Sequence, residues 1–258
     1  MKSNESSLTS LVSAFSRAYH SKYDTPKIFD DFIAKVIITD KEFHDISQNM
    51  IQGVRFFSKD VAQQFHDDPD EILKWITQVQ LSPTPLARAA YCENVLMNEI
   101  RLGLAQYVIL GAGLDTFCFR HPELEHSLQI FEVDHPATQA FKKQRLKNVN
   151  LTIPSNLHFV PMDFTKQFSD QALVQAGFDP RLKTFFSLLG VSYYLTKEEN
   201  ARLFHDLFEN VPSGSSVVFD YADEKLFEEA VLNFNVDFFD KFRETHPSGF
   251  PICNKNSL

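Results

Sequence analysis

Short apolar runs alternate with helix-spaced apolar positions along much of this chain. Five runs have the length and composition of buried parallel strands, over residues 106–110, 130–134, 157–160, 184–189 and 216–221. Between them, apolar residues recur every three or four positions, as is typical of amphipathic helices. Strands that alternate with helices predict an α/β fold with a doubly wound, mostly parallel, Rossmann-like sheet.

The region before the first strand is helical by the same pattern. Apolar residues predict a first helix that ends near residue 21, a second helical segment over 27–36 and further helices over 40–82. A new helix is expected to begin with Thr84 as its N-cap. This helix leads into the first strand.

The first strand ends in a Gly-x-Gly turn, and the second ends on an acid. Gly111 and Gly113 allow a tight turn and a close backbone approach. Asp134 follows Gly113 by 134 − 113 = 21 positions, the spacing at which a Rossmann-like fold presents a carboxylate to ribose hydroxyls. These three residues predict a site for a nucleoside cofactor.

The residues beside the turn favour one nucleoside over another. A dinucleotide fingerprint has a third glycine where this chain has Thr116. Asp115 also places negative charge where a pyrophosphate would bind. S-adenosylmethionine, which carries a sulfonium and an ammonium, suits this turn better. A NAD-dependent oxidoreductase is the alternative.

Several segments resemble the leucine carboxyl methyltransferase family, in particular its bacterial branch: 107–116, 131–139, 160–164 and 189–196. The similarity extends over roughly residues 8–225, with the motifs in the family's order. It implies a class I S-adenosylmethionine-dependent methyltransferase. By this resemblance, residues 1–82 form a helical lid over the cofactor and residues 83–258 form the Rossmann-like domain.

The resemblance also implies roles for individual residues. Arg88 corresponds to an arginine that pairs with the carboxylate of the cofactor, whereas by itself it would be a solvated surface charge. Asp163 would accept a hydrogen bond from the adenine amine, with Phe164 beside the ring, and otherwise Asp163 caps the next segment. The role of Arg17 in the lid stays open.

Other polar positions have two interpretations each. The basic helix over 142–147 is a phosphate patch or a solvated face, and the solvated face is favoured. Tyr193 and Tyr194 follow the fourth strand and either position the methyl acceptor or line a wall. Leu189 stands where the eukaryotic branch has an acid, so any polar contact of that acid is absent here.

Composition excludes several classes of protein. A formal net charge of −9 and a pI of about 5.5 argue against binding to nucleic acid. Cys92, Cys118 and Cys253 are too few and too scattered for a disulfide framework or a zinc site, and no metal is expected. Neither a signal peptide nor a membrane helix is recognisable, so a cytoplasmic protein without a membrane partner is predicted.

The sequence therefore predicts an S-adenosylmethionine-dependent O-methyltransferase that acts on a carboxylate of a small molecule or of a protein C-terminus. A carboxylate with a pKa of ~4 is already ionised at neutral pH and requires no general base. For this reason no catalytic residue is assigned. A protein that binds the cofactor without catalysis is a further alternative.

The C-terminal part lacks a further strand-like run. Residues 226–242 have helical spacing, and the Pro-rich stretch after them does not suit a central strand. Relative to the family, the chain is expected to be C-terminally shortened, with strands missing beyond 216–221. The exposed edge predicts association of copies through the C-terminal region and weak or absent activity.

Overall fold

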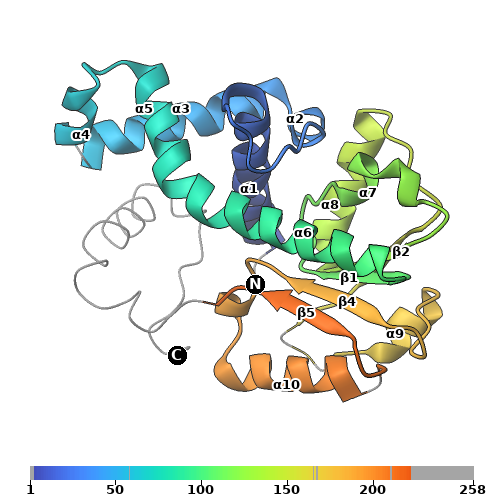
Figure 1. Cartoon of the computed structure of the whole chain (residues 1–258). Coiled ribbons are helices and arrows are strands. Elements are labelled where there is room, and N and C mark those ends of the chain that lie inside the picture. Colours follow the sequence, from blue (N-terminus) through green and yellow to red (C-terminus); the bar gives the residue numbers. More distant parts are fainter. Residues whose placement is uncertain (1–2, 58, 165, 167, 210, 222–258) are drawn as a thin grey trace. The chain divides into compact units, whose positions relative to one another are not determined.

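The computed structural model describes residues 3–57, 59–164, 166, 168–209 and 211–221. These residues form two compact units, one that ends at Ala87 and one from Arg88 to Tyr221 (Figure 1). In this part of the chain, none of the helices combines the length and apolar character needed to cross a membrane. The helix expected over 226–242 lies outside the described residues, so association through that region stays a prediction.

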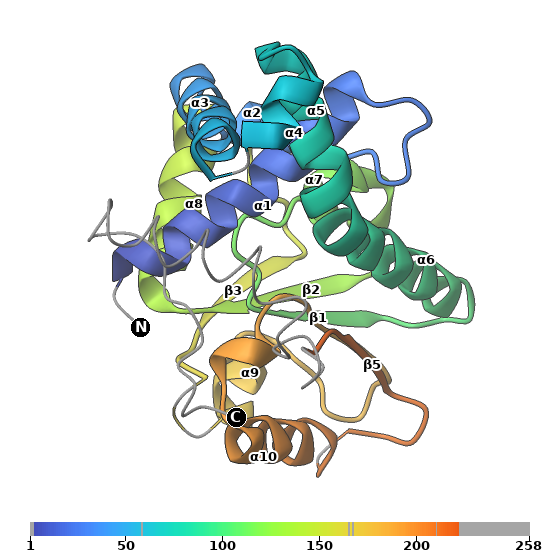
Figure 2. The ribbon, with the colours of Figure 1, turned by 90° about the vertical axis from the view of Figure 1, so that its left-hand side faces the viewer.

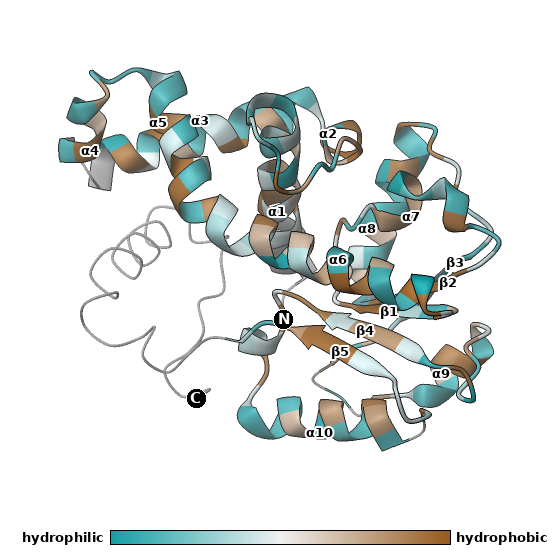
Figure 3. Cartoon of the chain, in the orientation of Figure 1, coloured by the Kyte–Doolittle hydropathy of each residue, from teal (hydrophilic) through white to brown (hydrophobic). Residues whose placement is uncertain are grey.

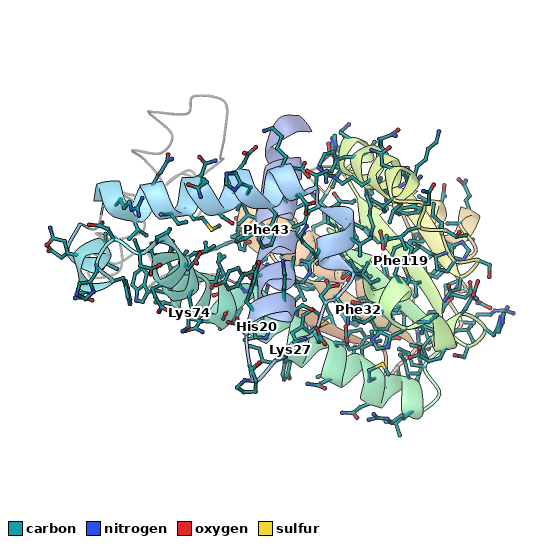
Figure 4. All side chains as sticks on the ribbon, turned by 90° about the horizontal axis from the view of Figure 1, so that it is seen from above. His20, Lys27, Phe32, Phe43, Lys74 and Phe119 are labelled. Atoms are coloured by element: carbon teal, nitrogen blue, oxygen red, sulfur yellow. The ribbon has the colours of Figure 1, made fainter. Side chains whose placement is uncertain are left out.

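The N-terminal unit is built from helices. They are α1 (Ser3–Tyr23), α2 (Ala34–Ile37), α3 (Asp40–Phe57), α4 (Lys59–Gln64), α5 (Pro69–Ile76) and η1 (Thr77–Leu86), of which η1 is a π-helix. Phe15 of α1 is fully buried, and its ring centroid lies 4.7 Å from that of Phe43 in α3 (Figure 4). Aromatic packing of this kind gives the unit its own core. The helices expected up to residue 21 and over 40–82 are confirmed.

The helix expected over 27–36 is wrong before Ala34. The buried His20 accepts a hydrogen bond from the backbone N–H of Ile28 through Nε2, at 2.9 Å. Asp31 accepts the N–H of Ala34 at 3.0 Å. Side-chain acceptors of this type compete with the helical hydrogen-bond ladder and hold this segment in turns.

The helix start expected at Thr84 is also wrong, because this residue lies within η1. Residues 77–86 are π-helical although they include two prolines. The chain therefore does not restart at Thr84, and α6 begins only at Ala87. Within η1 the Ser82 hydroxyl donates to the carbonyl oxygen of Thr77 at 2.8 Å.

The second unit contains a five-stranded parallel sheet in the order β3-β2-β1-β4-β5. Its strands are β1 (Gln106–Leu110), β2 (Gln129–Asp134), β3 (Leu157–Pro161), β4 (Thr184–Leu188) and β5 (Ser216–Phe219). The predicted α/β class with a doubly wound parallel sheet is confirmed. All five predicted strands are present.

Helices cover both faces of this sheet. On one face lie α6 (Ala87–Arg101), α7 (Phe117–Arg120) and α8 (Pro136–Asn148), and on the other lie α9 (Asp170–Gln175) and α10 (Lys197–Glu209) (Figures 1 and 2). Tyr107 and Ile109 point into the first layer, whereas Val108 and Leu110 point into the second. Burial on both sides explains why β1, β2 and β4 consist largely of buried residues. Figure 3 shows the hydropathy of the sheet and of the helices around it.

The carboxyl ends of the strands gather the loops that carry the predicted site. The strand order reverses at β1, which has β2 on one side and β4 on the other. In doubly wound sheets, ligands bind outside the carboxyl ends at such a switch point. Two short 3-10 helices, η2 (Pro122–Leu124) and η3 (Ser192–Tyr194), complete the described elements, and η3 lies in the loop after β4.

Candidate functional site

The turn after β1 depends on its glycines. Gly111 has φ 75°, and a Cβ there would lie 2.2 Å from Cγ2 of Val191 in the loop after β4. Gly113 has φ 52°, and its N–H donates to Oδ2 of Asp134 at 2.6 Å. Positive φ values favour glycine, and the missing Cβ lets the two loops meet. The structure thus brings Gly111, Gly113 and Asp134 together.

Asp134 at the end of β2 is 9% exposed. Its Oδ2 accepts the N–H of Gly113, and its Oδ1 accepts the N–H of His135 at 2.6 Å. Burial raises the pKa of Asp134, while these two N–H groups oppose that rise. The Thr138 side chain is a third donor to this carboxylate. Two carboxylate oxygens offer about four lone-pair positions, so the group can still accept a hydrogen bond from a ligand hydroxyl.

A buried ion pair beneath the turn was missed. The ammonium of Lys142 lies 2.7 and 2.6 Å from the two carboxylate oxygens of Glu132, and 2.6 Å from the carbonyl oxygen of Asp115. Both side chains are 2% exposed. The expected solvated face is therefore wrong for Lys142, although Lys143 and Lys147 are exposed. Glu132 was the available signal, because a carboxylate inside an apolar strand requires a cation.

The two charges of this pair support one another. Burial alone would lower the pKa of Lys142, but the carboxylates of Glu132 and Asp115 outweigh burial and raise it. Burial raises the pKa of Glu132, and Lys142 opposes that rise. Through the Asp115 carbonyl, the pair fixes the backbone of the turn that follows β1. Lys142 is thus a structural support for the glycine turn.

The segment after the turn is short. Asp115 accepts the N–H of Phe117 through Oδ1 at 2.8 Å, just before α7, which spans four residues. Thr116 is buried and accepts a hydrogen bond from Nε of Arg120 at 3.1 Å. This four-residue helix offers almost no helix dipole to a pyrophosphate.

Arg88 lies next to Gly190 and Asp220 at the other end of the carboxyl edge. Its Nη1 donates to Oδ2 of Asp220 at 2.5 Å, and its side chain is 19% exposed. Gly190 has φ 72° and donates its N–H to Oδ1 of Asp220 at 2.7 Å. A Cβ on Gly190 would lie 2.6 Å from Nη2 of Arg88 and 3.1 Å from the Tyr193 hydroxyl. Arg88 is therefore held at this edge by its ion pair and is not a solvated surface charge.

Asp220, the partner of Arg88, was not among the residues predicted from the sequence. It directly follows β5, just as Asp134 ends β2. An acid at the carboxyl end of a strand was the signal, and it was applied to Asp134 but not to Asp220.

Asp163 and Phe164 follow β3, the neighbour of β2. The N–H of Met162 donates to the carbonyl oxygen of Asp134 at 2.9 Å, which keeps the ends of the two strands in register. The Asp163 side chain is 32% exposed and lies 3.9 Å from the ammonium of Lys166. Phe164 packs against the apolar layer under α9 and α10. Asp163 is thus one strand away from Asp134, at the same edge.

The other residues singled out from the sequence lie in different elements of the structure. The rings of Tyr193 and Tyr194 have centroids 4.7 Å apart in η3. Leu189 packs on the layer under α6, so it contributes an apolar contact. Arg17, in the N-terminal unit, donates to Asp31 at 2.8 Å. The roles of Arg17 and the two tyrosines in the reaction stay open.

Two cysteines of the described chain are buried and free. Burial raises the pKa of Cys92 to about 12 and also raises that of Cys118. Thiols of this kind are unreactive at neutral pH. Cys253 lies outside the described residues.

Comparison with known proteins decides the family. The sequence profile of the leucine carboxyl methyltransferase family matches residues 10–208. The chain belongs to this family. The resemblance noted from the sequence motifs is confirmed, and with it the expectation of a methyltransferase enzyme.

Two relatives have names that agree with this family. A protein of Bacillus subtilis (strain 168), "Putative S-adenosyl-L-methionine-dependent methyltransferase YktD", is 70% identical over 227 residues, which cover 88% of this chain and 74% of that protein. A protein of Mycolicibacterium smegmatis, also named a putative S-adenosyl-L-methionine-dependent methyltransferase, is 29% identical over 240 residues, or 91% of this chain and 73% of that protein. The solved structure of mitomycin 7-O-methyltransferase MmcR is 16% identical, with a TM-score of 0.38, over 81% of this chain and 62% of that one.

Proposed function

We propose that this family member is an S-adenosylmethionine-dependent O-methyltransferase whose acceptor is a carboxylate. One observation carries the proposal, namely the order of side chains along the carboxyl edge. Arg88 lies by β4 and β5, the glycine turn follows β1, Asp134 ends β2 and Asp163 follows β3. Carboxylate, sulfonium, ribose and adenine follow one another in that order along the cofactor. With strands ~4.8 Å apart, β4 to β3 spans roughly 14 Å.

The side chains present suit each part of that cofactor. The Asp134 carboxylate accepts the N–H groups of Gly113 and His135 and keeps acceptor capacity for a ribose hydroxyl. Within the part of the chain that the structure describes, Arg88 uses one of its N–H groups, for Asp220. The others can grip a carboxylate with two parallel bonds. Phe164 offers an apolar surface beside Asp163, where the adenine ring would lie.

The same geometry disfavours NAD, the alternative cofactor. A pyrophosphate needs the N-terminus of a substantial helix, and α7 spans only Phe117–Arg120. Thr116 replaces the third glycine, and the carboxylate of Asp115 lies at the start of that helix. These features favour a cationic nucleoside.

A carboxylate acceptor suits the protonation chemistry of the site. When bound, S-adenosylmethionine supplies an electrophilic methyl group on its sulfonium. A bond forms from carboxylate oxygen to that carbon while the carbon–sulfur bond breaks, its electron pair stays on sulfur, and no proton moves. Nδ1 of His135 is occupied as the N-cap of α8, and the hydroxyl of Ser192 donates to the carbonyl of Asp220. The protein's part is to align the reactants in a site that excludes water.

Thermal unfolding with added ligands tests the cofactor. S-adenosylhomocysteine at ~100 times its dissociation constant should stabilise the protein by roughly 2.7 kcal/mol, and NAD should leave it unchanged. Asp134→Ala should lose most of that shift because the ribose hydroxyls lose their acceptor. Asp179→Asn, which alters a carboxylate paired with Arg181, is the matched control and should keep the shift. Stabilisation by NAD alone would overturn the proposal.

The bond formed in the product tests the acceptor class. Methyl groups carried on a labelled cofactor should appear on a carboxylic acid and should be released as methanol by mild alkali. A label that withstands alkali, on nitrogen, sulfur or a phenolic oxygen, would assign the enzyme to another acceptor class. That result would leave the cofactor assignment intact.

A further inference from the structure

Three elements converge on Asp220 at the end of β5. Its Oδ1 accepts the N–H of Gly190 at 2.7 Å, and its Oδ2 accepts Nη1 of Arg88 at 2.5 Å. Its carbonyl oxygen accepts the hydroxyl of Ser192 at 2.5 Å. These contacts fix the position of the carboxylate between the first turn of α6 and the loop after β4.

The Arg88 and Asp220 side chains are accessible from the carboxyl edge. They are 19% and 21% exposed, so the pair is neither sealed in the core nor fully solvated. Each oxygen of Asp220 accepts one bond and keeps a lone pair for a further donor. Arg88 likewise has N–H groups without a partner among the described residues. Both members can therefore bind a ligand without breaking their own contact.

We infer that Asp220 binds the ammonium of the cofactor's α-amino-acid end, beside the carboxylate that Arg88 binds under the proposed function. This inference rests on the proposed function and adds Asp220 as a binding residue. An amino-acid zwitterion carries opposite charges on groups attached to one carbon. A cation and an anion that lie 2.5 Å apart at the site present the complementary pair of charges.

Position favours Asp220 over the other acids of this edge. Asp134 lies on β2, which is separated from β4 by β1, and it already accepts two backbone N–H groups. Asp115 accepts the N–H of Phe117. Asp220 instead contacts Gly190, whose neighbour Val191 touches the glycine turn at Gly111. The carboxylate thus lies beside the junction of the two loops where the amino-acid end would be bound.

Ligand analogues separate this role from simple support of Arg88. Calorimetry would compare S-adenosylhomocysteine with two analogues, one with hydrogen in place of the ammonium and one with hydrogen in place of the carboxylate. The proteins would be the natural chain, Asp220→Asn, Arg88→Gln and the control Asp179→Asn. Asp220→Asn should weaken S-adenosylhomocysteine on the order of tenfold or more, and the control should not.

The loss caused by Asp220→Asn should nearly vanish with the analogue that lacks the ammonium. The loss caused by Arg88→Gln should nearly vanish with the analogue that lacks the carboxylate. If the Asp220→Asn loss instead vanishes with the analogue that lacks the carboxylate, Asp220 only positions Arg88 and the inference is overturned. Tighter binding by Asp220→Asn would overturn it too, because Asp220 would then compete with the cofactor for Arg88.

The natural protein supplies a test that needs no substitution. It should bind the analogue without the ammonium roughly tenfold more weakly than S-adenosylhomocysteine. Equal affinity would overturn the inference even if Asp220→Asn failed to fold. Failure of the proposed function gives a different result, since none of the three ligands would then bind the natural protein.

Discussion

The two ends of the carboxyl edge are built in different ways. Below the glycine turn, Glu132 and Lys142 are each 2% exposed and form an ion pair inside the core. At the other end, Arg88 and Asp220 are about ten times more accessible, at 19% and 21%. The first pair supports a turn, and the second keeps unused hydrogen-bonding capacity at an open edge. Substitutions at the first end should therefore change stability, and those at the second should change ligand affinity.

The largest effect is expected from Lys142→Met. This change leaves the Glu132 carboxylate buried without its cation, which should cost about 3–5 kcal/mol of unfolding free energy. Urea denaturation measures the loss, and Lys143→Met, at an exposed neighbour, is the control. The double change Glu132→Leu with Lys142→Met should recover much of the stability. A loss below about 1 kcal/mol would contradict the contrast between the two ends.

The next effect concerns α6, the helix that carries both Arg88 and Glu93. Burial alone would raise the pKa of Glu93, but hydrogen bonds from Arg120 and His121 outweigh burial and lower it to about 2. Because its pKa is lower in the folded protein, the ionised Glu93 stabilises the fold fully at pH values above its ordinary pKa of 4.5. This stabilisation is lost as the pH falls toward 2. Glu93→Gln should therefore cost about 3 kcal/mol at pH 7.

Denaturation at several pH values checks this expectation. The difference between the natural protein and Glu93→Gln should shrink steadily between pH 4.5 and 2. Glu123→Gln removes an exposed partner of His121 and should cost less than about 0.5 kcal/mol. A difference that does not vary with pH would mean that Glu93 acts through packing alone.

A smaller effect on stability is expected from Gly190→Ala. Its positive φ disfavours alanine by about 1–2 kcal/mol, and the added Cβ would lie 2.6 Å from Nη2 of Arg88. Because that atom ends a flexible side chain, Arg88 should move and affinity for S-adenosylhomocysteine should fall roughly tenfold. Gly177→Ala has a similar φ of +102° with nothing within 4 Å, so it should lose stability but not affinity. Equal affinity for both variants would show that Arg88 is not needed in its present position.

The smallest effect is expected from Asp163→Asn, because this side chain is about one-third exposed. Affinity for S-adenosylhomocysteine should fall only a few-fold, about 1 kcal/mol, with no change in melting. Calorimetry with the inosine analogue, which lacks the adenine amine, should show no such difference between the two proteins. Lys166→Ala removes the cation 3.9 Å away and serves as the control. A loss that persists with the analogue would remove Asp163 from the adenine site.

Local patterns predicted the elements better than their boundaries. Each of the five strands was predicted, because buried strands read as continuous apolar runs. The helix over 27–36 was overextended because side chains of His20 and Asp31 take the backbone donors there. The start at Thr84 was wrong because the helical backbone continues through both prolines as η1, where the Ser82 hydroxyl adds a hydrogen bond to the Thr77 carbonyl. Both errors arise from side-chain hydrogen bonds that periodicity does not encode.

The sequence by itself determined the parallel sheet, the Gly111 turn and the acid at Asp134, because each depends on neighbours in the chain or on a fixed spacing. Only the tertiary structure decided that Lys142 is buried and that Asp220 meets Arg88, 132 positions away. A charge looks the same in the sequence whether it is solvated or paired. Its environment is set by the strands and helices that packing brings beside it, and those partners are distant in the chain.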